Sequence, residues 1–392
     1  GKPETMLELD ILPTDAANAC LVGRVWCPDL EGPSVVTIRD GAVFDICDAV
    51  PTMRDLCEAK DPTGLVSGTD GCFIGTLEEI AARSIEAHRD PSGPWLLAPI
   101  DLQAVKALGV TFIASLLERV IEEKAGGDPV KAAAIRVDIE TLLGGDLSHL
   151  QPGSSEAALV KERLLERGMW SQYLEVGIGP DPEIFTKAQP LSCVGYGADI
   201  GVLSTSSWNN PEPEVALAVN SRGRPVAATL ANDVNLRDYE GRSALLLGKA
   251  KDNNASCAVG PFLRLFDSTF DLHDVRKIEV KLKVTGADGF ELSGSSSMTQ
   301  ISRDPSALVD HAIGPSHQYP DGLLLLLGTM FAPTQDRDDP GKGFTHKPGD
   351  RVKISAEKLG CLSNIVRYCH ECTPWTIGTA FLMRNLSVRG LI

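Results

Sequence analysis

The chain of 392 residues is short of positive charge and of long apolar runs. Its 37 Lys and Arg residues against 53 Asp and Glu residues give a formal net charge of −16. That sign disfavours nucleic acid or an anionic membrane as a partner. No run approaches the roughly 18 apolar residues of a membrane-spanning helix, and the run at 323–327 instead predicts a buried strand. The first residues have no apolar core of a signal peptide, so we expect a cytoplasmic location.

Common cofactor and metal signatures are missing as well. The glycine pairs at 177–179 and 195–197 lack the third glycine of a dinucleotide fingerprint. The seven histidines show no metal-ligand spacing, and Cys369 and Cys372 have no second cysteine pair to complete a zinc site. The ten cysteines are scattered in a large chain without a secretory signal, which predicts reduced thiols.

The first quarter of the chain reads as a small unit of strands and helices. Residues 20–50 alternate apolar and polar side chains around turns, which predicts short strands, whereas 51–58 and 77–88 have helical spacing. The Pro/Gly segment 90–94 is a strong breaker. We therefore predict a small N-terminal α/β domain over 1–94 and a catalytic domain over 95–392.

The second unit changes from helical to β-rich along its length. Residues 109–173 keep one apolar helical face, with breaks at 126–129 and 151–154 that predict about three helices and a helical insertion at about 122–170. Beyond 174, short apolar runs predict strands, and one helix is predicted over 235–249. The runs lie at 215–219, 226–230, 278–284, 323–327 and 352–354. The predicted fold class is α+β, with a mostly-β catalytic domain.

Three carboxylates form the most informative pattern. Glu212 and Glu214 point to one side of an extended strand that Pro211 and Pro213 keep from becoming helix, and Asp233 ends the next predicted strand. Singly, the glutamates fit an exposed acidic edge and Asp233 fits a helix N-cap. Together, they would raise each other's pKa unless a cation lies between them, and a hard divalent ion prefers such oxygen ligands. The pattern predicts a metal-dependent enzyme.

The order of these motifs resembles the fumarylacetoacetate hydrolase superfamily. The run Glu-Pro-Glu at 212–214 is followed by Asn-Asp-Val-Asn-Leu-Arg-Asp at 232–238 and by Lys-Ala-Lys at 249–251. The segments 182–187, 328–329 and 347–350 also match, in the right order. The likeness runs from about residue 95 to the end, and the N-terminal piece is compatible with the family's small first domain.

The resemblance implies a mixed β-roll with a divalent cation, Mg²⁺ or Mn²⁺, held by Glu212, Glu214 and Asp233. It implies that Lys251 steadies the negative charge developing on a chelated 2-oxo acid. The matching positions Lys187 and Thr329 are expected to hold the substrate carboxylate and the metal shell. We also expect substrate contacts from Ser115 and Arg119 on the lid helix.

One departure from the family pattern decides the predicted reaction. The carbon–carbon hydrolases carry a lid histidine and glutamate that activate water, and this chain has Ser115 and Glu118 there. A serine is no base near neutral pH. Glu183 resembles the proton-transfer glutamate of the sugar-acid dehydratases, so Glu183, Glu118 and Lys251 are the predicted catalytic residues.

The predicted activity is dehydration of a 2-keto-3-deoxy-D-pentonate to 2-oxoglutarate semialdehyde in pentose catabolism. The alternatives are an acylpyruvate-type hydrolase or 2-oxo-acid decarboxylase of the same fold, and a non-catalytic protein that binds sugar acids. The family resemblance further implies a homodimer or homotetramer.

Overall fold

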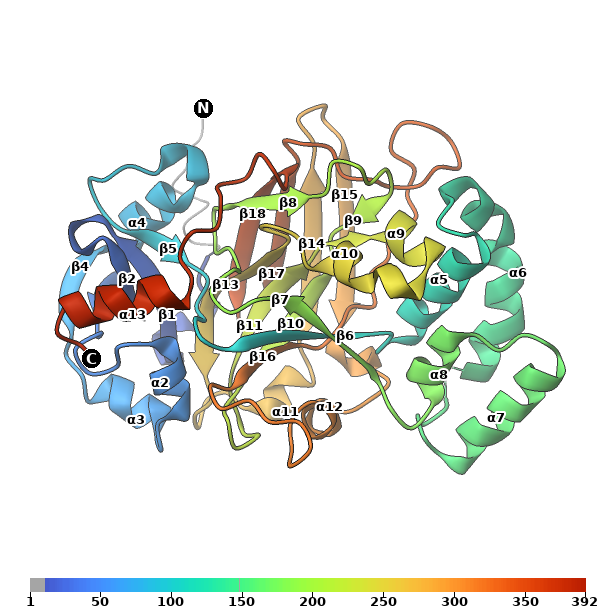
Figure 1. The fold of residues 1–392 in the computed structure, drawn as a ribbon, viewed down its shortest axis with the longest axis horizontal. Coiled ribbons are helices and arrows are strands. Elements are labelled where there is room, and N and C mark those ends of the chain that lie inside the picture. The colour runs from blue at the N-terminus through green and yellow to red at the C-terminus, as the bar shows by residue number, and fades with distance from the viewer. Residues whose placement is uncertain (1–10, 148) are drawn as a thin grey trace.

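A computed structural model describes residues 11–147 and 149–392, without the side chains of 140 and 142–146. Two β-sheets fill the middle of the molecule, with a helical group at one end and the first strands at the other (Figure 1). Within the described residues, no helix combines the length and apolar character needed to cross a membrane. The mostly-β, α+β prediction is confirmed.

The larger sheet has eleven strands in the order β4-β3-β2-β1-β13-β11-β10-β16-β6-β7, with β5 paired to β1. Its strands are β1 (Leu21–Cys27), β2 (Gly32–Arg39), β3 (Ala42–Asp45), β4 (Cys72–Thr76), β5 (Trp95–Leu97), β6 (Ala104–Gly109), β7 (Glu183–Ala188), β10 (Pro213–Val219), β11 (Pro225–Asp233), β13 (Cys257–Leu265) and β16 (Leu323–Leu326). Strand β1 pairs with β13, so the first strands continue the sheet that carries the later ones. The division at residue 94 stays a prediction.

The smaller sheet has five strands in the order β15-β14-β17-β18-β8. They are β8 (Asp199–Val202), β14 (Glu279–Thr285), β15 (Glu291–Ser297), β17 (Arg351–Ala356) and β18 (Gly360–Tyr368), and β9 (Asn209–Asn210) pairs separately with β12 (Asn235–Leu236). Side chains of both sheets, among them Leu217 and Leu282, share one buried apolar cluster. Each apolar run that predicted a strand lies in or overlaps an observed strand. The runs are apolar because their side chains are buried in the interior that the two sheets share.

The helices flank the sheets. They are α2 (Met53–Glu58), α3 (Pro62–Ser67), α4 (Leu77–Ser84), α5 (Ile113–Lys124), α6 (Pro129–Leu147), α7 (Ser155–Glu166), α8 (Gln172–Ile178), α9 (Arg237–Arg242), α10 (Leu247–Lys251), α11 (Leu272–Val275), α12 (Pro305–Ala312) and α13 (Thr379–Val388). Helices α5 to α8 gather at one end, as Figure 1 shows in green. The helical character predicted for 109–173 is confirmed by α5, α6 and α7.

The single helix predicted over 235–249 is wrong. The chain forms strand β12, then α9, then a 3₁₀ turn at Ala244–Leu246 and α10. Ser243 breaks the helix because its backbone is extended and its hydroxyl accepts a hydrogen bond from the Leu245 N–H, which begins the new turn. Asp233 ends β11 and α9 begins after Leu236, so Asp233 does not cap that helix.

The turn between α5 and α6 lies directly against α9. Gly127 has φ +78°, and a Cβ atom there would come within 2.5 Å of the Asp238 carbonyl oxygen. A Cβ atom on Gly241 would come within 2.5 Å of the Gly127 Cα atom. This close backbone contact requires glycine and fixes α5 and α6 beside the strand ends that carry the acidic residues.

Candidate metal centre

Glu212, Glu214 and Asp233 meet at the adjoining ends of β10 and β11. The antiparallel register pairs Pro213 with Asn232, and the Asp233 N–H donates to the Glu212 carbonyl oxygen at 3.0 Å. Each carboxylate offers one oxygen within 4.8 Å of the others, and all three side chains are buried. The alternation of β side chains has placed three acids at one point, as the sequence predicted.

Gly328 completes the backbone frame of this group. It follows β16 with φ +89°, and its N–H donates to Glu214 Oε2 at 2.9 Å. A Cβ atom on Gly328 would come within 2.1 Å of Thr111 Oγ1. Only glycine fits here, so one oxygen of Glu214 is fixed by the backbone.

Two lysines neutralise Asp233. Lys251 Nζ lies 3.2 Å from Asp233 Oδ2 and 2.8 Å from Glu212 Oε1, and Lys187 Nζ lies 3.1 Å from Asp233 Oδ1. Burial alone would raise the pKa of Asp233, but both lysines outweigh it and hold the pKa at about 2. Lys187 is fully buried and also donates to the Val234 and Lys251 carbonyl oxygens, so it anchors Asp233 from behind.

The two glutamates are not neutralised to the same degree. Burial, followed by the negative charges of Asp233 and Glu212, raises the pKa of Glu214 well above its ordinary value. Burial likewise raises the pKa of Glu212 to about 7, although Lys251 opposes the shift. The cluster therefore has more negative charge than its lysines balance.

A second set of buried ion pairs connects this cluster to the helices. Arg119 on α5 contacts Glu212 at 2.9 Å, Glu122 at 2.7 Å and Glu240 at 3.0 Å. Arg237 on α9 contacts Glu122 and Glu118, each at 2.6 Å. The network thus runs without a break from the metal-ligand candidates to the helical insertion.

Glu118 is held by arginines and does not line the cavity at the acidic cluster. Arg136 on α6 donates to both of its carboxylate oxygens at 2.9 Å, and Arg237 donates to one of them. Burial would raise the pKa of Glu118, but the two arginines outweigh burial and lower it. The predicted proton-transfer role of Glu118 stays a prediction. In the structure, its carboxylate joins Arg136 on α6 to Arg237 on α9.

The formal charges of this buried group do not balance. It comprises seven carboxylates, on residues 118, 122, 183, 212, 214, 233 and 240, and five cations, on residues 119, 136, 187, 237 and 251. By formal charge, a divalent cation would offset this surplus of two carboxylates, and carboxylate oxygens are the ligands that Mg²⁺ prefers. The residues present therefore fit a divalent ion at Glu212, Glu214 and Asp233.

A narrow cavity faces the cluster. Besides the three acids and Lys251, its polar lining is formed by Ser115, Arg119, Glu183, Glu240 and Thr329. The Ser115 hydroxyl donates to the Phe112 carbonyl oxygen at 2.9 Å at the start of α5, and Thr329 Oγ1 accepts from the Phe331 N–H. Of the predicted site residues, the structure places all but Lys187 and Glu118 on this cavity.

Glu183 differs from the other acids around the cavity. Burial raises its pKa, and Arg119 and Lys251 only partly offset the effect. Among the described residues its carboxylate has no ion-pair partner, and Gly109 leaves it room, since a Cβ atom there would come within 2.6 Å of Glu183 Oε2. A half-buried carboxyl group with a raised pKa on a cavity wall is suited to proton transfer.

Two acids of the site were missed from the sequence. Glu240 lies on the cavity between Arg119 and Lys251, and Glu122 joins Arg119 to Arg237. The spacing of Arg237 and Glu240 along one helix was visible, but a solvated helix face gives the same pattern. Burial, which only the fold reveals, distinguishes the two cases.

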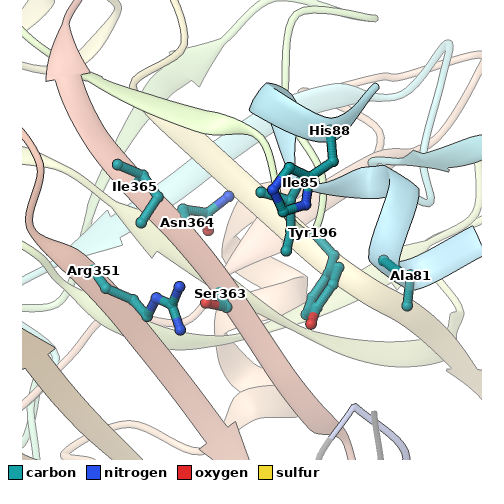
Figure 2. Close-up of a pocket in the computed structure, with 10 residues that line it drawn as sticks. Ala81, Ile85, His88, Tyr196, Arg351, Ser363, Asn364 and Ile365 are labelled. Carbon is teal, nitrogen blue, oxygen red and sulfur yellow. The ribbon is translucent and has the colours of Figure 1, made fainter. Parts of the chain in front are cut away.

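A separate hollow lies away from the acids, between the α4 region and strands β17 and β18 (Figure 2). Its polar side chains include His88, Tyr196 and Arg351, and it contains no member of the charged network.

No disulfide joins any of the ten cysteines, all of which lie among the described residues.

Comparisons with known proteins agree with this geometry. The family model described as "Fumarylacetoacetate (FAA) hydrolase C-terminal" matches residues 171–367. The chain is 32% identical over 192 residues to the 2-dehydro-3-deoxy-D-arabinonate dehydratase of Saccharolobus solfataricus, covering 49% of this chain and 61% of that protein. It is 28% identical over 269 residues to a probable 2-keto-3-deoxyxylonate dehydratase of Haloferax volcanii, covering 68% of this chain and 86% of the relative.

Solved structures give the same fold. The apo form of a 2-keto-3-deoxy-D-arabinonate dehydratase superposes with a TM-score of 0.62 at 22% identity, over 89% of this chain and 99% of that one. A structure of such a dehydratase with magnesium and 2,5-dioxopentanoate superposes with a TM-score of 0.61 at 22% identity over the same shares.

Proposed function

Because the chain belongs to the fumarylacetoacetate hydrolase family, we propose that it is a divalent-cation-dependent dehydratase of a 2-keto-3-deoxy-D-pentonate. The products are water and 2-oxoglutarate semialdehyde. The main support is the buried triad of Glu212, Glu214 and Asp233 next to Lys251 and Glu183, whose carboxyl group has no ion-pair partner in the described part of the chain. The two dehydratase relatives support the substrate class.

The ion held by the triad, Mg²⁺ or Mn²⁺, would polarise the 2-oxo group and acidify the hydrogens at C3. Glu183 removes one C3 proton. As the double bond forms between C3 and C4, the C4 hydroxyl leaves as water after receiving a proton. A proton then leaves C5 and another is added at C3, which gives the enol of C4 and C5. Addition of a proton at C4 and loss of the C5 hydroxyl proton then yield the C5 aldehyde, with atoms in balance.

Lys251 has an electrostatic role in this scheme. Its ammonium group is buried and lies between Glu212, Asp233 and Glu240, whose charges raise its pKa although burial opposes this. It therefore stays cationic and can stabilise the negative charge that develops on the substrate oxygens. Arg119 and Thr329 are assigned to the substrate carboxylate because both line the same cavity.

The position of Ser115 favours dehydration over carbon–carbon hydrolysis. The hydroxyl is engaged with the Phe112 backbone, and a serine without a neighbouring base does not activate water. A protein that only bound sugar acids would have no need of a carboxyl group with a raised pKa on the cavity. We also assign a homo-oligomeric state and a cytoplasmic location as part of this proposal.

A coupled assay tests the proposed function. The chain is incubated with 2-keto-3-deoxy-D-pentonate, with and without EDTA, and the aldehyde is followed through an NADP-linked dehydrogenase. Product that EDTA abolishes and Mg²⁺ restores is the expected result. Faster cleavage of an acylpyruvate than dehydration of the pentonate would instead assign the hydrolase reaction.

A further inference from the structure

Glu183 and Glu240 also line a second pocket, which is lined by none of the three triad residues. This outer pocket is bounded by α8 and by the segment from Ser243 to α10, and its other lining residues are Gln172, Tyr173, Val176, Ala244 and Leu247. The two glutamates are the residues that the outer pocket and the metal-side cavity have in common. The two spaces therefore meet at Glu183, the proposed proton-transfer group, and at Glu240 beside it.

The sizes of the two spaces show why both are needed. The metal-side cavity measures about 10 Å³, which is room for one water molecule, whereas the outer pocket measures about 210 Å³. The ion and a 2-oxo acid head group can enter the metal-side cavity only if water and lining side chains move aside. The rest of a five-carbon chain has no space there and needs the outer pocket.

From this geometry we propose that the outer pocket is the subsite for the hydroxylated C4–C5 end of the substrate. The assignment rests on the proposed function. A substrate whose oxo group faces the triad passes C3 beside Glu183, and its next carbons then extend between Glu183 and Glu240. The amide of Gln172 and the hydroxyls of Tyr173 and Ser243 are uncharged groups suited to bind hydroxyls.

The subsite separates two classes of substrate. Pyruvate has the chelating head group but no chain beyond C3, so it needs only the metal-side cavity. Exchange of its methyl hydrogens for deuterium, followed by NMR in the presence of Mg²⁺, reports the metal and Glu183 without the outer pocket. Dehydration of the pentonate requires both spaces.

The test fills the mouth of the outer pocket. Ala244 lines it and is exposed, and its neighbour Leu245 is 96% exposed without lining it, so Ala244→Trp and Leu245→Trp form a matched pair. We expect A244W to lower kcat/KM for the pentonate by about tenfold or more, chiefly through KM, with pyruvate exchange unchanged. L245W should leave both unchanged.

Two results would overturn the subsite: an unchanged kcat/KM of A244W for the pentonate, or equal losses for the pentonate and pyruvate. Tyr173→Phe supplies an independent variant, since it removes one hydroxyl with little change of volume, and it should raise KM for the pentonate alone. If the wild-type chain exchanges pyruvate hydrogens but does not dehydrate the pentonate, the proposed function fails. The subsite is then tested separately, because A244W must impair exchange at C3 of 2-oxopentanoate but not of pyruvate.

Discussion

Two groups of buried acids lie side by side in this molecule, and cationic side chains balance one group more completely than the other. Glu118 and Glu122 each accept charge-assisted hydrogen bonds from two arginines. Glu212 and Glu214 adjoin Asp233, and burial together with like charge raises the pKa of both glutamates. Burial alone therefore does not identify a metal site. A metal site is identified by buried negative charge that the neighbouring cationic side chains do not balance.

The largest effect is expected where arginines match the acids. Glu122→Gln leaves Arg119 and Arg237 with reduced counter-charge, and breaking a buried ion pair costs about 3–5 kcal/mol. Chemical denaturation should show this loss with and without Mg²⁺. An unchanged free energy of unfolding would mean that the arginine-matched group is not structural.

Removing one ligand of the triad should act on metal binding instead. Asp233→Asn keeps the shape of the side chain and deletes one charge. Loss of a residue that only supports a metal ligand typically lowers metal affinity 10–100-fold, so loss of a ligand should lower Mn²⁺ affinity at least about 100-fold. Electron paramagnetic resonance of free Mn²⁺ measures this directly. Asp238→Asn is the matched control, since Asp238 bonds to Ser206 and Ser207 outside the triad, and it should retain affinity.

The stability of the metal-free chain should depend on pH in an unusual direction. The pKa of Glu212 is about 7 in the folded chain against 4.5 ordinarily, so the folded state binds more protons between these values. Stability in EDTA should therefore increase as pH falls from about 8 to 5, by up to a few kcal/mol. Saturating Mg²⁺ should remove or reverse this trend. Thermal unfolding across that pH range, in EDTA and in Mg²⁺, measures both.

The smallest effect should come from moving Glu183 without deleting it. Gly109→Ala places a methyl group where the Glu183 carboxylate lies, so kcat should fall about tenfold to 100-fold while Mn²⁺ affinity is retained. Gly248→Ala on α10 serves as the control, because nothing lies within 4 Å of its added Cβ atom. Equal kcat values for the two variants would argue against Glu183 as the proton-transfer group.

The sequence predicted the triad well because its geometry is local. Alternation places Glu212 and Glu214 on one face, and β11 returns directly from β10 to bring Asp233 beside them. Apolar runs likewise predicted β10, β11 and β16, since burial on both faces leaves little choice of residue there. Strands β14 and β17 alternate buried and more exposed positions, the pattern of a strand buried on one face. The family resemblance added Lys251, Thr329 and Glu183, which come from separate parts of the chain.

What the sequence could not predict depends on distant packing. Glu240 and Glu122 resemble solvated helix residues until the contact of Gly127 with α9 buries them. The break at Ser243 rests on a single side-chain hydrogen bond that competes with a continuous helix. Glu118 matched the position of a family catalytic residue, but Arg136 and Arg237 hold its carboxylate away from the cavity.

The most direct test of the unmatched charge is Glu214→Gln. If Glu212, Glu214 and Asp233 repel one another in the absence of an ion, Glu214→Gln should raise the Tm in EDTA and lose the stabilisation that Mg²⁺ gives the wild type. A variant that is less stable in EDTA, or that Mg²⁺ stabilises as much as the wild type, would contradict the assignment of the triad as a cation site.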